Sequence, residues 1–200
     1  MDNAVNIVIC GLGGQGVVMI SRILAEVALS EGHKAIGADV LPISQRLAST
    51  MSFVRIGEDI FSEVVPEGEA DLLIGFEPLQ TLKYGVAFAS ENGSVIMNER
   101  PIDLRPNLKV RYPAGSEILA YFREMGVGRL IHFDALEIAI RITGSMLALN
   151  MVMLGAAFAT DLIPAQRKTF ETIIRKVTPR GEVEGNIEAF LAGIAAVAKA

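Results

Sequence analysis

Residues 5–16 read VNIVICGLGGQG, and this stretch decides the fold of the 200-residue chain. An apolar run ends in a glycine, and apolar residues at helical spacing follow from Val17 to Ala28. This pattern predicts a buried strand, a glycine turn and a helix. In such a unit the glycines permit a tight turn, close approach of a phosphate to the backbone, and close packing of the helix. We therefore predict a phosphate-binding loop formed by Gly11, Gly13, Gly14, Gln15 and Gly16.

Strand-like and helix-like segments alternate up to about residue 134. Strands are expected at 34–38, 71–76, 93–98, 109–112 and 130–133, and helices at 78–90 and 116–125. Residues 51–56 and 60–65 each alternate apolar and polar residues around Gly57-Glu58-Asp59, which predicts an antiparallel hairpin. This order predicts an α/β fold with a Rossmann-like, mainly parallel sheet and an antiparallel hairpin insertion.

The last third of the chain shows only helical patterning. Three helical segments are expected from Ala135 onward, ending near Asp161, Val177 and Ala200. We predict a single domain over 1–200, with a Rossmann-like core at about 5–134 and a helical region at about 135–200.

Composition narrows the class of protein. Hydrophobic residues make up 51% of the chain and aromatic residues 6%, which suits buried parallel strands. A net charge of -5 without a basic stripe argues against nucleic-acid binding. The apolar run 145–159 is interrupted by Asn150 and is short for a membrane span, so no membrane contact is expected. A single cysteine, Cys10, predicts no disulfide, no metal site and a reducing, cytoplasmic location.

The glycine loop has other interpretations. A glycine turn kept only for tight packing would look the same. An NAD site would need an acidic residue at the end of the second strand, and Asp39 is the candidate, although it lies further from the last glycine than is usual. A nucleoside triphosphate loop is excluded because no Gly-Lys-Ser or Gly-Lys-Thr follows. His33 and His132 have no nearby nucleophile, so both are interpreted as structural and no catalytic residue is expected.

Five short motifs resemble one known family. They are GLGGQGVV at 11–18, SQR at 44–46, VRIG at 54–57, ADLL at 70–73 and NMVMLG at 150–155. In order and spacing they resemble the gamma subunit, or gamma domain, of 2-oxoacid:ferredoxin oxidoreductases of the pyruvate/ketoisovalerate type, over about residues 5–160. Residues 76–78 (FEP) and 95–98 (VIMN) look closer to the indolepyruvate oxidoreductase beta subunit.

The resemblance implies a multi-subunit enzyme. Such enzymes decarboxylate a 2-oxoacid such as indolepyruvate or pyruvate on thiamine diphosphate, pass electrons through iron–sulfur clusters to ferredoxin, and release an acyl-coenzyme A. This chain lacks a thiamine diphosphate signature and has too few cysteines for a cluster, so both cofactors are expected on alpha and beta partner subunits. An isolated chain is expected to be able to form a homodimer through the surface meant for partners.

The gamma domain of this family lies beside the active site and the coenzyme A region. Our hypothesis is that backbone amides of Gly13–Gly16 hold a phosphate of coenzyme A or a similar anion, with Gln15 adding a side-chain hydrogen bond. Residues expected to face the active site or a partner subunit are Ser44, Gln45, Arg46, Asn98 and Asn150. An ordinary surface ion pair is an equal explanation for Arg46.

Two features leave alternatives open. The family usually has Arg-Gly-Gly where this chain has Arg46-Leu47-Ala48, so the substrate class differs if that loop approaches the substrate. The helix around Asn150, rich in methionine (Met146, Met151 and Met153), is either a core helix or a subunit-facing one. The alternative functions are a free-standing NAD-binding or redox-sensing module that uses Asp39, and a purely structural subunit.

Overall fold

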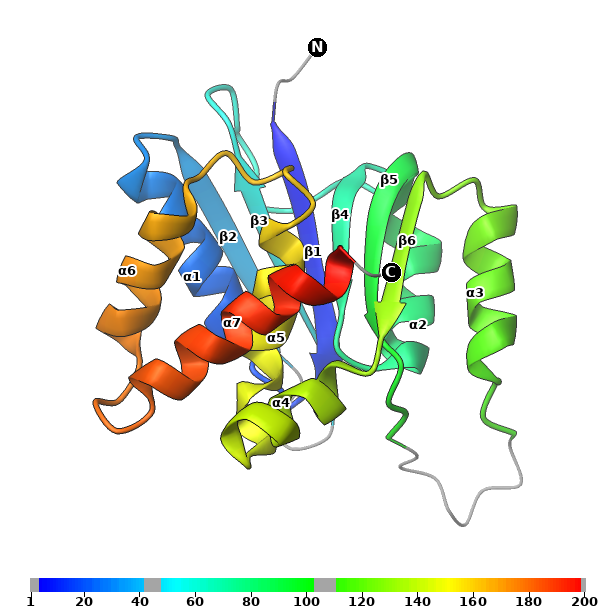
Figure 1. Ribbon diagram of the computed structural model, residues 1–200. Helices are drawn as coiled ribbons and strands as arrows, with labels where there is room; N and C mark the ends of the chain where they lie inside the picture. The colour runs from blue at the N-terminus through cyan, green and yellow to red at the C-terminus, as the bar shows by residue number, and fades with distance from the viewer. Residues whose placement is uncertain (1–3, 42–47, 103–110, 199–200) are drawn as a thin grey trace.

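A computed structural model describes residues 4–41, 48–102 and 111–198, which form a six-stranded sheet between two layers of helices (Figure 1). The strand order is β2-β3-β1-β4-β5-β6. β3 runs antiparallel to both of its neighbours, while β1, β4, β5 and β6 are mutually parallel. The strands are β1 (Val5–Leu12), β2 (Ala35–Val40), β3 (Ser49–Ile56), β4 (Ala70–Gly75), β5 (Ala89–Asn98) and β6 (Arg129–Phe133).

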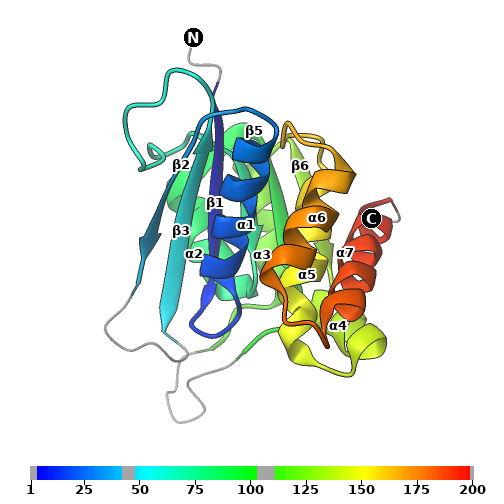
Figure 2. The same cartoon turned by 90° about the vertical axis from the view of Figure 1, so that its left-hand side faces the viewer.

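The two faces of the sheet are covered unequally (Figures 1 and 2). On one face lie α1 (Val17–Ser30), α4 (Ala135–Thr143), α5 (Leu149–Phe158), α6 (Arg167–Val177) and α7 (Val183–Val197), with a short 3-10 turn η1 at Met146–Ala148. The other face carries α2 (Pro78–Phe88) and α3 (Gly115–Glu124). A hydrophobic core lies on each face of the sheet, and alternate residues of β1 pack into one or the other. Ile7 and Ile9 face α1, while Val8 and Cys10 face α2.

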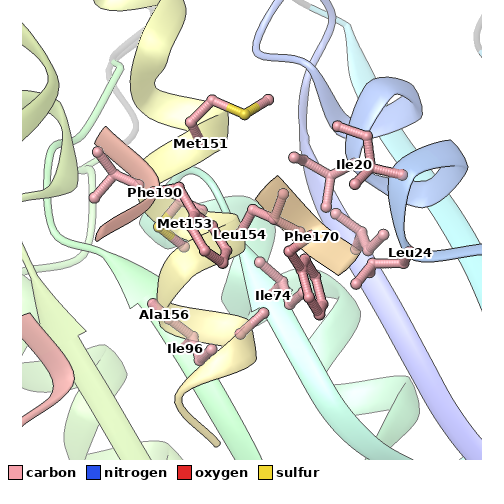
Figure 3. Close-up of a cluster of buried hydrophobic side chains, with 14 of the residues drawn as sticks. Ile20, Leu24, Ile74, Ile96, Met151, Met153, Leu154, Ala156, Phe170 and Phe190 are labelled. Carbon is pink, nitrogen blue, oxygen red and sulfur yellow. The ribbon is translucent and has the colours of Figure 1, made fainter. Parts of the chain in front are cut away.

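Helix α5 is the centre of the larger core. All residues from Leu149 to Ala157 are buried, and Met151 and Met153 pack with side chains of α1, α6, α7 and the sheet (Figure 3). The core interpretation of this helix is therefore confirmed. Met146, in η1, is instead 65% exposed.

The backbones of α5 and α7 approach each other closely at two glycines. A Cβ atom built on Gly155 would lie 1.9 Å from the carbonyl oxygen of Phe190, and one built on Gly193 would lie 2.0 Å from that of Val152. Only residues without a Cβ fit at this crossing. The tight crossing buries α5 beneath α7 without a gap.

The predicted α/β class is confirmed, but the predicted hairpin pairs differently. Residues 51–56 do form an antiparallel strand, yet β3 pairs with β1 on one edge and β2 on the other, and residues 60–65 form no strand. A strand has only two hydrogen-bonding edges, so none remains for residues 60–65. The backbone there is instead held by Arg55, whose guanidinium donates to the carbonyl oxygen of Ser62 (3.1 Å).

Other boundaries need smaller corrections. The first C-terminal helical segment is divided, because Gly144 ends α4 in the left-handed conformation (φ 69°). In the expected strand 109–112, residues 111 and 112 are not in a strand, and residues 109 and 110 lie outside the described part of the chain. No helix in the described ranges is long and apolar enough to cross a lipid bilayer.

Candidate anion site at the glycine loop

The glycine loop connects the carboxyl end of β1 to α1, as predicted. Gly14 and Gly16 have φ angles of 98° and 93°, which favour glycine. A Cβ atom on Gly16 would also lie 2.7 Å from Nδ2 of Asn150, so the start of α1 packs directly on α5. The loop is fixed on its other side because the Gly13 N–H donates to the carbonyl oxygen of Ala48 (2.8 Å).

Several amides of the loop and of the first helical turn have no acceptor among the described residues. The N–H groups of Gly14, Gly16, Val17 and Val18 donate no hydrogen bond to any residue in the described ranges, and no side chain caps α1. A pocket of about 390 Å³ opens over them, lined by the loop residues together with Leu41 and Thr50. Unpaired amides at a helix N-terminus favour a negative charge, so an oxyanion fits this pocket.

Gln15 uses its side chain beneath the loop. Its Oε1 accepts a hydrogen bond from the Leu12 N–H (2.7 Å), and its Nε2 donates to the carbonyl oxygen of Phe76 (3.1 Å). The amide thus joins the end of β1 to the residue that follows β4. With these bonds Gln15 holds the loop in shape, and a direct bond to a phosphate would have to come from its one remaining Nε2 hydrogen.

Asn98 meets the same carbonyl group from the other side. This residue ends β5, is 1% exposed, and donates through Nδ2 to the Phe76 carbonyl oxygen (3.0 Å). Its Oδ1 accepts from the N–H of Ala135 at the start of α4 (3.0 Å). Asn98 therefore lies under the loop and positions it, rather than lining an open site.

The remaining predicted site residues fall into two groups. Asn150 is 7% exposed, and its side chain lies beside Gly16, accepts from the Met151 N–H (2.8 Å) and contacts the sulfur of Met19 (3.3 Å). It therefore meets the glycine loop from within the core. Ser44, Gln45 and Arg46 lie outside the described residues.

Glu77 is a buried acidic residue for which the sequence predicted no role. It is 1% exposed, caps α2 by accepting from the Gln80 N–H (2.9 Å), and accepts a hydrogen bond from the hydroxyl of Tyr112. In the sequence Glu77 stands out only as part of the FEP stretch at 76–78, in which Pro78 favours the first turn of a helix. Burial, with a contribution from the Glu77 carboxylate, raises the pKa of the Cys10 thiol well above its usual value, which disfavours the thiolate.

Asp39 is not placed as a ribose-binding acid would be. β3 lies between β1 and β2, which puts Asp39 about 10 Å from β1 across two strand spacings. One oxygen of its carboxylate, Oδ1, accepts hydrogen bonds from the hydroxyls of Ser52 (2.6 Å) and Ser21 (3.0 Å). The carboxylate therefore ties β2 to β3 and α1. His132 is likewise engaged, through Nδ1 with Glu99 (2.6 Å).

The shared carbonyl of Phe76 gives a stability prediction. Gln15→Glu and Asn98→Asp each replace a donor with an oxygen facing that carbonyl, so each should lower the free energy of unfolding by about 1–3 kcal/mol in urea denaturation. Because each single variant leaves the Phe76 carbonyl its other donor, the double variant should lose more than the sum of the two. The matched change Asn92→Asp, at an exposed residue, should cost little. Strict additivity would show that the two side chains act separately.

A family model and curated relatives match this chain over almost its whole length. The family model described as pyruvate ferredoxin/flavodoxin oxidoreductase matches residues 6–196. The indolepyruvate oxidoreductase subunit IorB of Pyrococcus horikoshii is 35% identical over 196 residues, which cover 96% of this chain and 95% of that protein.

Solved structures share the fold. The gamma subunit of a keto/oxoacid ferredoxin oxidoreductase from Geobacter sulfurreducens has a TM-score of 0.69 at 22% identity, over 98% of this chain and 99% of that one. The 2-oxoglutarate:ferredoxin oxidoreductase of Magnetococcus marinus has a TM-score of 0.74 at 16% identity, and the match covers all of this chain but only 32% of that longer chain. With the family model spanning nearly its whole length, this chain belongs to the pyruvate ferredoxin/flavodoxin oxidoreductase family.

Proposed function

We propose that this chain is the gamma-type subunit of a cytoplasmic 2-oxoacid:ferredoxin oxidoreductase of the indolepyruvate type. The observation that carries the proposal is the 35% identity to an indolepyruvate oxidoreductase subunit over almost the full length of both proteins. In this proposal thiamine diphosphate and the iron–sulfur clusters belong to alpha and beta partners, which also pass electrons to ferredoxin. This chain completes the active site they form.

The contribution of this chain is the anion pocket at the glycine loop. The amides of Gly14, Gly16, Val17 and Val18 hold a phosphate of coenzyme A, while Gln15 holds the loop to the Phe76 carbonyl, which Asn98 also bonds. The preformed backbone geometry lets the amides bind the anion without a large ordering cost. If the subunit were only structural, residues 11–16 would gain no protection from hydrogen exchange when coenzyme A binds the complex.

Reconstitution tests the function. The partner subunits, produced with and without this chain, are assayed for ferredoxin reduction driven by indolepyruvate, pyruvate or 2-oxoglutarate in the presence of coenzyme A. We expect reduction to require this chain and to be fastest with indolepyruvate. Full activity of the partners without this chain would refute the proposal, and a preference for another oxoacid would refute the indolepyruvate assignment alone.

The NAD-binding alternative gives a separate prediction. The Asp39 carboxylate is already bonded to two serine hydroxyls, and β3 separates its strand from β1, so the purified chain should show no saturable NAD binding by calorimetry. Asp39→Ala should then change stability but no binding signal. Saturable NAD binding that disappears in Asp39→Ala would instead establish the alternative.

A further inference from the structure

A second polar cluster lies at the same end of the sheet, on the opposite face from the glycine pocket. Ser49 begins β3 in register with Leu12 of β1, and Gln80, Lys83 and Tyr84 come from α2. The side chain of Ser49 points toward α2, because Met51 and Phe53, two and four residues further along β3, pack in the core against that helix. The functions considered above make no use of this cluster.

The hydrogen bonds of the cluster have one consistent direction. The Ser49 hydroxyl lies 2.6 Å from Oε1 of Gln80, an oxygen that can only accept, so Ser49 donates its single hydrogen there. The oxygen of Ser49 must then accept from its other neighbours. These are the ammonium group of Lys83 (2.9 Å) and the hydroxyl of Tyr84 (2.8 Å).

Because Ser49 donates to Gln80 and accepts from Lys83, both Gln80 and Lys83 keep unused hydrogen-bond donors at the surface. Lys83 keeps ammonium hydrogens and Gln80 keeps both Nε2 hydrogens, none of which meets an acceptor in the described part of the chain. Lys83 has no carboxylate partner among the described residues. The lysine and arginine ion pairs found there all join other side chains. Its ammonium instead lies 4.8 Å from the centre of the Tyr84 ring, a contact that leaves its charge in place.

We propose that Ser49, Gln80, Lys83 and Tyr84 form a second oxyanion site, which takes a carboxylate or phosphate group. An ammonium beside amide donors is the donor set that binds such groups, and the serine and tyrosine orient it. The site is separate from the glycine pocket but close to it, because the Gly13 N–H bonds to Ala48, the residue before Ser49.

The test titrates the purified full-length chain with inorganic phosphate and with acetate, while NMR follows the side-chain amide of Gln80. We expect saturable shifts with at least one anion, and binding at least tenfold weaker in Lys83→Met. Lys83→Arg should retain most of the affinity because the charge remains. Lys168→Met, which removes an exposed lysine from α6, should leave it unchanged.

A further variant separates this site from the glycine pocket. Gly14→Asp places a negative charge at the loop on the other face, and Gln80 should still respond with an affinity within about twofold of the original chain. Loss of the response in Gly14→Asp, equal weakening in Lys168→Met, or shifts that do not saturate would each overturn the proposal. A response to acetate alone identifies a carboxylate site, and a response to phosphate alone a phosphate site.

Discussion

Gly155→Ala is expected to destabilise the protein by about 3 kcal/mol, although alanine is the better helix former. On propensity alone the change inside α5 should stabilise the protein by about 1 kcal/mol. The new Cβ atom would, however, lie 1.9 Å from the carbonyl oxygen of Phe190 on α7, so the two helices must move apart. The effect is measured as the change in the free energy of unfolding in urea. A loss of stability shows that the clash with α7 outweighs helix propensity, and a gain shows the reverse.

Gly185→Ala is the control, because Gly185 is also a helical glycine, in the first turn of α7. A Cβ atom there would meet only the side chain of Thr143, whose methyl carbon lies at 3.3 Å, so the change should be close to neutral. Gly193→Ala should resemble Gly155→Ala, since its Cβ would meet the carbonyl oxygen of Val152 at 2.0 Å. Equal stability of the Gly155 and Gly185 variants would contradict a tight crossing of α5 and α7.

Local sequence patterns predicted most of the elements but not the order of the strands. The apolar run before Gly11 and the helical spacing after it identify β1 and α1. In each element the buried residues recur with the period of that element, so the pattern can be recognised in the sequence. Strand order is a non-local property. The alternation at 51–56 is the same whether that strand pairs with 60–65 or inserts between β1 and β2, so the sequence could not distinguish these arrangements.

The candidate site shows a similar limit. Glycine spacing predicted the loop, because only glycine suits the positive φ angles of residues 14 and 16. The buried bonds beneath the loop join residues far apart in the chain: Gln15 and Asn98 meet at the carbonyl of Phe76, which has no signal of its own in the sequence. Asp39 shows the opposite case: it is the acidic candidate at the end of the second strand, yet β3 lies between that strand and β1.

The glycine pocket gives the second large effect, and Gly14 offers a clean pair of variants. Gly14 is exposed, and a Cβ atom on it would contact nothing within 4 Å. Gly14→Asn and Gly14→Asp have the same shape and share the strain of φ 98°, but only aspartate adds a charge beside the amides of the loop. If a phosphate of coenzyme A occupies the pocket, Gly14→Asp should raise the KM for coenzyme A in the reconstituted complex about a hundredfold over Gly14→Asn.

That ratio follows from charge repulsion. Two negative charges a few ångströms apart at a protein surface repel by about 3 kcal/mol, which corresponds to about a hundredfold in affinity, and added salt should reduce the difference. The KM for the 2-oxoacid should stay within about twofold, because the change is confined to the coenzyme A pocket. Equal KM values for the two variants would show that no anionic group of coenzyme A lies against the loop. Coenzyme A binding that survives bulky replacements of both Gly13 and Gly16 would lead to the same conclusion from steric exclusion alone.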